Sequence, residues 1–265
     1  MRTVLLLTGC VRPDGMPYTQ LTDVDVRRRQ YMDAIDFYLE QTDCPVVFCE
    51  NSQTDLSSAF AEHPQCRRLE CLTFRAGGDN QRGKGYGEVE IIGYAFKHAR
   101  ALREPCTVVK ITGRLMVTNI AAIVRSLTYR KDFVTCLMHS DLSFADSRVF
   151  CGSTAFYREL LEERERVNDS QGVFLEHVLR DVVMASPIAF RPFEEEPLIT
   201  GMSGTTGETY VAPQHSVQHQ RRYRIYAYRQ WQQINRQSTN RHVGFVERCY
   251  ITMNTLKYRL IAKYL

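Results

Sequence analysis

Polar, charged or glycine residues follow four apolar runs of this sequence at the point where each run ends. They are Thr8-Gly9, Glu50-Asn51-Ser52, the glycine-rich loop at 77–87 and Thr112-Gly113-Arg114. Each run has the length and composition of a buried strand. Because the carboxyl ends of parallel strands meet at one edge, where α/β sheets bind ligands, we expect the four clusters to line one site.

Two cations of the run at 107–114 have the chemistry to hold an anion. Lys110 interrupts a buried run and needs an anionic or hydrogen-bonding partner there. Arg114 follows Gly113, which permits close backbone approach, and its planar guanidinium suits a diphosphate. A structural ion pair at the strand end is the alternative for each cation.

The glycine-rich loop offers a second place for a phosphate. Residues 78–85 fit G-x-x-x-x-G-K, but Gly85 stands where a nucleotide-binding P-loop has the Ser or Thr that holds Mg²⁺. Arg82, Lys84 and Gly85 before a helix still suit a phosphate, unless the glycines serve only the turn. Glu88 follows in the first helical turn, where it either caps the helix or binds a ribose or sugar hydroxyl.

The order of elements predicts the fold that positions these residues. Strand patterns at 3–9, 45–50, 66–74, 107–111, 133–138 and 147–151 alternate with helical patterns at 26–41, 55–62, 88–102, 119–127, 156–166 and 173–184. This alternation predicts an α/β fold, a mainly parallel sheet flanked by helices. We expect a catalytic domain at 1–200, a flexible loop at 201–219 and a basic helical tail at 220–265.

Composition narrows the class of protein. Of 265 residues, 44% are hydrophobic and 24% charged, which is typical of globular domains and argues against long disordered regions. The nine cysteines include no C-x-x-C pair and lie mostly in apolar runs, so a disulfide framework or a zinc site is not expected. The apolar stretch at 4–7 is too short for a signal peptide or a spanning helix, so we expect a cytoplasmic protein.

The combination of Glu50-Asn51-Ser52, the segment 83–88, the segment 110–114 and Asn119 resembles bacterial glycosyltransferases of surface-polysaccharide gene clusters, such as those for capsule and lipopolysaccharide. The resemblance covers about residues 1–190. It implies an A-type, Rossmann-like fold and transfer of a hexose from a nucleotide-sugar to a glycan or lipid-linked acceptor.

The sequence departs from metal-dependent members of that fold at one position. Those members have Asp-x-Asp after the fourth strand, where this chain has Thr112-Gly113-Arg114. Either Lys110 and Arg114 supply the positive charge, or Asp146 recruits Mn²⁺ or Mg²⁺. Asp146 and Arg148 are also candidates for binding the donor sugar or for pairing with each other.

The resemblance also places a catalytic base on the helix that faces the acceptor. Transfer with inversion needs a carboxylate that takes the proton of the acceptor hydroxyl. Glu176 and Asp169 are seven residues apart and are expected on one helix face, with Glu176 as the base and Asp169 as a second carboxylate or a cap.

Charge is distributed unevenly along the chain. Residues 220–265 contain ten Lys or Arg and one acid, a charge of +9, which leaves −5 for residues 1–219 of the total +4. On a helix, Leu256, Leu260 and Ile261 lie on one side, so we expect docking on the anionic inner face of the cell membrane. Packing of the tail on the acidic domain is the alternative.

Two other functions remain open from the sequence. A P-loop-like nucleotide kinase or ATPase is suggested by the glycine loop. A nucleic-acid-binding protein is suggested by aromatic residues interleaved with arginines in the tail, although the acidic charge of residues 1–219 argues against nucleic acid.

Overall fold

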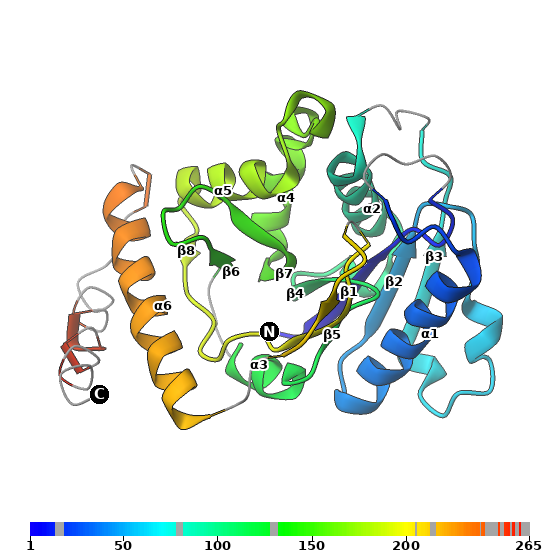
Figure 1. The fold of residues 1–265 in the computed structure, drawn as a ribbon, viewed down its shortest axis with the longest axis horizontal. Helices are drawn as coiled ribbons and strands as arrows, with labels where there is room; N and C mark the ends of the chain where they lie inside the picture. The colour runs from blue at the N-terminus through cyan, green and yellow to red at the C-terminus, as the bar shows by residue number, and fades with distance from the viewer. Residues whose placement is uncertain are drawn as a thin grey trace.

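A seven-stranded sheet forms the centre of the structure, a computed structural model (Figure 1). The strand order is β3-β2-β1-β4-β7-β6-β8. The bounds are β1 Thr3–Gly9, β2 Val46–Glu50, β3 Leu69–Thr73, β4 Thr107–Thr112, β6 Phe133–Met138, β7 Ala145–Ser153 and β8 Ala189–Phe190. All neighbours are parallel except at β7, which runs antiparallel to both β4 and β6. The prediction of a mainly parallel α/β sheet is therefore confirmed.

The structure describes residues 1–13, 19–77, 82–127, 132–204, 206–212, 216–238 and 240–241, together with 249, 252–254, 256–257 and 260. Residues 78–81 of the predicted glycine loop, and Ile261 of the predicted apolar side of the tail, lie outside the described residues.

Helices cover both faces of the sheet because the strands are apolar on both sides. Helices α1 (Val24–Gln41) and α3 (Ile120–Ser126) share one buried cluster with the strands. Helices α2 (Lys84–His98), α4 (Thr154–Glu162) and α5 (Leu175–Ala185) share the other. The described part of the chain also contains short 3₁₀ helices: η1 Ser57–Phe60, η2 Cys66–Arg68, η4 Arg100–Leu102, η5 Arg164–Arg166 and η6 Asp169–Gln171.

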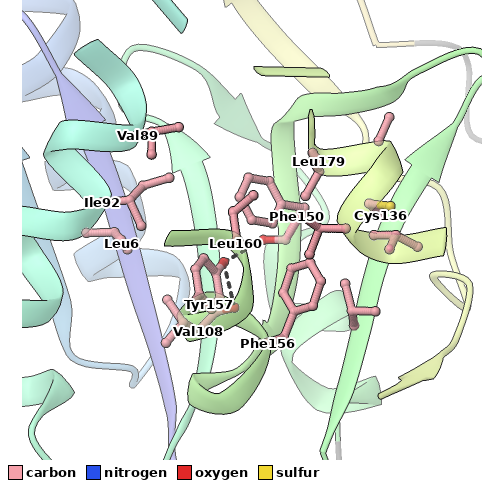
Figure 2. Packing of buried hydrophobic residues seen from close by; sticks show 14 of the residues in the cluster. Leu6, Val89, Ile92, Val108, Cys136, Phe150, Phe156, Tyr157, Leu160 and Leu179 are labelled. Carbon is pink, nitrogen blue, oxygen red and sulfur yellow. Dashed lines mark hydrogen bonds between the residues drawn. The ribbon is translucent and has the colours of Figure 1, made fainter. Parts of the chain in front are cut away.

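Tyr157 of α4 lies at the centre of one of these clusters (Figure 2). Its ring stacks near Phe150 at a centroid distance of 5.5 Å. Its hydroxyl donates to the carbonyls of Val108 on β4 and Phe150 on β7. The contacts join the strands on either side of the first antiparallel boundary, so they fix β7 beside the parallel strands.

A small second sheet lies beside the main one, in the order β10-β9-β5. Its strands are β5 Met116–Val117, β9 Ile199–Met202 and β10 Thr209–Tyr210. Part of the segment that we expected as a flexible loop thus forms a hairpin. Gly201 and Gly207 have positive φ angles of 121° and 72°, which explains why glycine recurs in this hairpin.

Helix α6 (Val217–Gln237) lies along the β8 edge of the sheet (Figure 1). Its apolar face is buried, with Tyr223 and Trp231 at 7% and 2% exposure. Beyond it, buried Arg241 donates to carbonyls of Val183, Ser186 and Ile188. The first part of the basic tail therefore packs on the domain. In the described part of the chain, we find no helix with the length and apolarity needed to span a bilayer.

Candidate active site

A pocket of about 380 Å³ lies where β1 and β4 end, with the β9–β10 hairpin along its rim. The predicted residues that line it are Thr8, Gly9, Asn51, Lys84, Glu88, Thr112, Arg114, Asp146, Arg148 and Glu176. The strand-end rule therefore brings together residues from widely separated segments at one edge of the sheet. Three of the four predicted clusters follow β1, β2 and β4. These strands are parallel neighbours in the sheet, so their carboxyl ends lie side by side.

Glu88 lines this pocket and forms an ion pair with Lys110. Lys110 is fully buried, so the predicted need for an anionic partner is confirmed. Thr8 Oγ1 donates to Glu88 Oε1 at 2.8 Å. Burial raises the pKa of Glu88, but the charge and hydrogen bond of Lys110, together with the Thr8 hydrogen bond, outweigh burial and lower this pKa below its ordinary value. Glu88 is thus a weak base.

The helix that carries Glu88 begins earlier than the sequence predicts. Helix α2 starts at Lys84, which places Glu88 in the second turn. The prediction that Glu88 lies in the first turn is wrong, and capping does not explain it. The side chain of Glu88 instead points to the strand ends, where its partners Thr8, Lys110 and Thr112 belong to β1 and β4.

Asp146 and Arg148 form a second neutralised pair, at the start of β7. The Arg148 Nε donates to both Asp146 oxygens at 3.0 and 3.1 Å, and Nη2 donates to Oδ2 at 2.5 Å. The Arg148 guanidinium also lies over the Tyr210 ring, 4.8 Å from its centroid. Of the alternatives left open, the structure shows the internal pair.

Glu176 is the third carboxylate that lines the pocket. It lies in the first turn of α5, and its Oε1 accepts a hydrogen bond from Ser147 Oγ at 2.5 Å. Among the residues that the structure describes, no cation forms an ion pair with Glu176, whereas Glu88 and Asp146 each have one. Glu176 therefore differs from the other two pocket carboxylates in its partner, which is a neutral hydroxyl and not a cation.

Arg114 lies in the pocket wall and is 8% exposed. Its Nη1 donates to Gln30 Oε1 and to the Met202 carbonyl, each at 3.2 Å. A Cβ on Gly204 would lie 2.2 Å from Arg114 Nη2, so a larger residue there would push the guanidinium aside. The guanidinium is therefore oriented by the hairpin at the edge of the cavity, a position from which it can face an anion.

Asp169 occupies the helix N-terminus that the sequence offers to a phosphate. Its Oδ2 accepts from the Gly85 N–H at 2.7 Å, and η6 places it outside α5. The prediction that Asp169 and Glu176 share a helix face is wrong, because Asp169 caps α2 instead. Burial raises the pKa of Asp169 above its ordinary value.

Arg82, the other residue expected at this phosphate site, is also engaged elsewhere. Its guanidinium donates to Glu165 Oε2 at 2.7 Å and to the Val167 carbonyl at 2.8 Å. It also lies 3.8 Å from the centroid of the Tyr86 ring. Arg82 therefore connects the residues before α2 to η5 and to Val167 after it. These contacts give it a structural role in place of the predicted role at a phosphate. A true P-loop would need this N-terminus open to the nucleotide.

Three further predicted residues shape the pocket from behind it. Glu50 is fully buried and accepts hydrogen bonds from the backbone of Ser52 and Thr54 at 2.8 and 2.7 Å, so it orders the turn instead of binding a donor. Ser52 Oγ accepts from the backbone N–H groups of 11 and 12. A Cβ on Gly113 would lie 2.7 Å from the Thr8 carbonyl, so the close approach expected there is confirmed.

Several pocket residues are missing from the sequence prediction: Arg27, Tyr31, Phe144, Ser147, Met202, Ser203, Gly204 and Tyr210. Tyr31 has the spacing of a core residue, and it is 2% exposed. Ser147 lies between Asp146 and Arg148, which were both predicted, so its position in the sequence is a signal that could have identified it. The hairpin residues belong to a glycine-rich segment. That pattern indicates a turn but does not predict that the turn lies beside the pocket.

The described residues contain no group of three or more His, Cys, Asp or Glu side chains arranged to hold a metal ion. Asp146, the predicted ligand, has both oxygens bonded to Arg148. A cation at that carboxylate would have to displace a guanidinium. Within the described residues, the carboxylate predicted to recruit Mn²⁺ or Mg²⁺ is thus occupied by Arg148.

No protein-family model and no curated protein matches the sequence. Among solved structures, the chain is similar to the apo structure of the bifunctional glycosyltransferase WbbM, with 10% identity over 61% of this chain and a TM-score of 0.35. That alignment spans 34% of WbbM, about a third of its length. HddC from Yersinia pseudotuberculosis aligns with 11% identity over 73% of this chain and 90% of its own, with a TM-score of 0.40. A cytidylyltransferase from Leptospira borgpetersenii serovar Hardjo-bovis aligns with 15% identity over 66% of this chain and 74% of its own, with a TM-score of 0.32.

Proposed function

We propose that this protein is a glycosyltransferase that moves a sugar from a nucleotide-sugar donor to an acceptor hydroxyl, with Glu176 as the general base. The observation that carries the proposal is the contrast among the three pocket carboxylates. Glu88 and Asp146 are neutralised by Lys110 and Arg148, while the described neighbours of Glu176 provide only the Ser147 hydroxyl. Among the described residues that line the pocket, Glu176 is the carboxylate without a cation beside it, which fits the role of a general base.

The reaction would be a direct displacement that inverts the anomeric centre. The acceptor O–H gives its proton to Glu176 as its oxygen forms a bond to the anomeric carbon. The bond from that carbon to the phosphate oxygen of the donor breaks, and the nucleotide leaves with the electron pair. Arg114 and the exposed Lys84, which both line the pocket, supply positive charge toward this leaving group.

The donor would lie over the parallel strands, as ligands do in sheets of this type. Asn51 is 6% exposed, lines the pocket, and has an Oδ1 that is buried without a hydrogen-bond partner in the described structure. The ionised Glu88 is suited to accept hydrogen bonds from ribose or sugar hydroxyls. We propose, on the resemblance to surface-polysaccharide enzymes, that the acceptor is a bacterial glycan or lipid-linked sugar.

A thermal-shift panel tests the proposal. A ligand at a hundred times its dissociation constant stabilises the folded state by about 2.7 kcal/mol, a readily measured rise in Tm. We expect one class of UDP-, GDP- or CMP-sugar to stabilise the protein and ATP to have no effect. Stabilisation by ATP with no response to any nucleotide-sugar would contradict the proposal and favour a kinase or ATPase.

We also propose that the transferase works without a bound metal, since Asp146 is paired with Arg148 and Arg114 lies at the pocket wall. Transfer should then continue in EDTA at its full rate. Loss of transfer in EDTA with recovery in Mn²⁺ or Mg²⁺ would contradict this proposal and show that the reaction needs a metal.

The basic tail supports a proposal about where the enzyme acts. Tyr223 and Trp231 are buried, so they are not available to stack on nucleic-acid bases or to lie in a headgroup layer. The arginines of α6 remain exposed: Arg221, Arg222, Arg224, Arg229 and Arg236. Each cation near an anionic leaflet contributes about 1 kcal/mol, so we propose that this face holds the enzyme at the inner surface of the membrane.

Sedimentation with anionic vesicles at low salt tests this docking. The double variant R221Q/R222Q should pellet less than the unaltered protein. The pair R28Q/R29Q is the matched control, because it removes two adjacent exposed arginines from α1. Equal loss in both variants would show a general charge effect, and no loss in either would exclude α6 as the contact.

A further inference from the structure

Among the described residues, Ser147 is the residue of the sheet that forms a hydrogen bond with the proposed base, Glu176. It lies on β7, is 5% exposed, and donates its hydroxyl proton to Glu176 Oε1 at 2.5 Å. Within the described residues, the Glu176 carboxylate has no other hydrogen bond. The bond occupies one carboxylate oxygen and leaves Oε2 to meet a substrate.

The backbone of Ser147 is itself held in place. Its carbonyl accepts a hydrogen bond from Lys110 Nζ at 2.6 Å, and Lys110 is fully buried and paired with Glu88. Contacts therefore run from Glu88 through Lys110 and Ser147 to Glu176. They cross from β4 to β7, the boundary between the parallel strands and the reversed strand.

We propose that Ser147 is a positioning residue for the base Glu176, anchored by Lys110. This inference rests on the proposed function. A catalytic base must be held within a fraction of an ångström of its working place, and a misplacement of about 1 Å costs about a hundredfold in rate. Ser147 meets that need through its 2.5 Å hydrogen bond to Glu176 Oε1, and it leaves the other carboxylate oxygen available to the acceptor.

The variant Ser147→Ala tests the proposal in steady-state transfer assays. We expect kcat to fall by roughly tenfold to a hundredfold, with little change in KM for the donor, because the donor lies over the other strands. Ser147→Thr keeps a hydroxyl and should recover most of the rate. In a Glu176→Gln background, Ser147→Ala should have almost no further effect, because residues that act as a unit are not additive.

Ser153→Ala is the matched control. Ser153 is a buried serine at the opposite end of the same strand, where its hydroxyl accepts from the Phe156 N–H and caps α4. This variant should lower the Tm and leave kcat unchanged. It separates the loss of a buried hydroxyl from β7 from the loss of the contact to Glu176.

Three outcomes overturn the inference. They are an unchanged kcat in Ser147→Ala, failure of Ser147→Thr to recover the rate while it remains folded, and a full additional loss in the Glu176→Gln background. If the unaltered protein transfers no sugar from any nucleotide-sugar, the proposed function fails as well. An active enzyme with an insensitive Ser147 overturns the positioning role alone.

Discussion

The two sides of the pocket reach the same edge of the sheet by opposite routes. On β1 and β4, which are parallel, the pocket residues come at the end of each strand, as Thr8 and Thr112 do. On β7, which runs the other way, they come at the beginning, as Asp146 and Ser147 do. A residue's place relative to its strand therefore predicts its place in the pocket only when the strand's direction is known.

The two sides also differ in charge. The carboxylate over the parallel strands, Glu88, is paired with a buried cation, while Glu176 beside the reversed strand has a neutral hydroxyl. On the proposed function, the first side binds the donor and the second side takes the proton. Lys110 belongs to both, because it contacts Glu88 and also the Ser147 carbonyl.

Removal of Lys110 should have the largest effect on stability. Lys110→Met leaves the Glu88 carboxylate without its cation in a buried site, and breaking such a pair costs about 3–5 kcal/mol of unfolding free energy. Urea denaturation measures the loss. The double variant K110M/E88Q should recover much of it, because no charge is then left unpaired; a double variant as unstable as the single one would show that packing around Lys110 is what matters.

Removal of Arg114 should weaken the binding side without unfolding the protein. Loss of one charge-assisted contact to a developing leaving group lowers the rate by about 10²–10³-fold, so we expect this loss of kcat/KM in Arg114→Ala. Arg114→Lys should also be slow, since a point charge does not replace the planar fork.

Gly204→Ala tests the position of the Arg114 guanidinium without replacing the arginine itself. Its Cβ would displace the guanidinium, so the variant should move kcat/KM in the same direction as Arg114→Ala. Gly77→Ala is the control, because a Cβ there meets nothing closer than 3.8 Å. A fully active Arg114→Ala enzyme would remove Arg114 from the account.

A smaller effect is expected at the cap of α2. Asp169→Ala removes the acceptor for the Gly85 N–H and should cost about 1 kcal/mol of unfolding free energy. Asp169→Asn keeps an acceptor and should cost less.

The pH dependence of these variants tests the raised pKa of Asp169. Because the folded chain holds this proton more tightly than the unfolded chain, its stabilising contribution is complete below the ordinary value of 3.8 and is lost as the pH rises through the folded pKa. Relative to Asp169→Asn, the unaltered protein should therefore lose stability as the pH rises from below 3.8 toward neutral. Parallel stability curves for the two proteins would contradict the shift.

The sequence predicts the fold and the strand-end side of the pocket well because both depend on local patterns. Apolar runs that end in Thr8-Gly9 and Thr112-Gly113-Arg114 predict strands and a shared edge, and the structure confirms them. The cap of α2 by Asp169 joins residues 84 positions apart, so no local pattern contains it. From local patterns alone, the glycine loop is therefore interpreted as a phosphate site.

The reversed strand escaped prediction for a related reason. The alternation of strands and helices predicts parallel pairing, and a run such as 147–151 has the same pattern in either direction. The resemblance nevertheless predicts Glu176 as a base, and the structure places this residue in the lining of the pocket.

The most direct test of the account compares Glu176→Gln with the unaltered enzyme at saturating donor and acceptor. Gln keeps the size of the side chain and its acceptor for Ser147 but does not take a proton. General-base catalysis contributes about 10²–10⁴-fold, so kcat should fall by that factor while calorimetry shows the same donor Kd. An unchanged kcat would show that another group accepts the proton and would contradict the central claim.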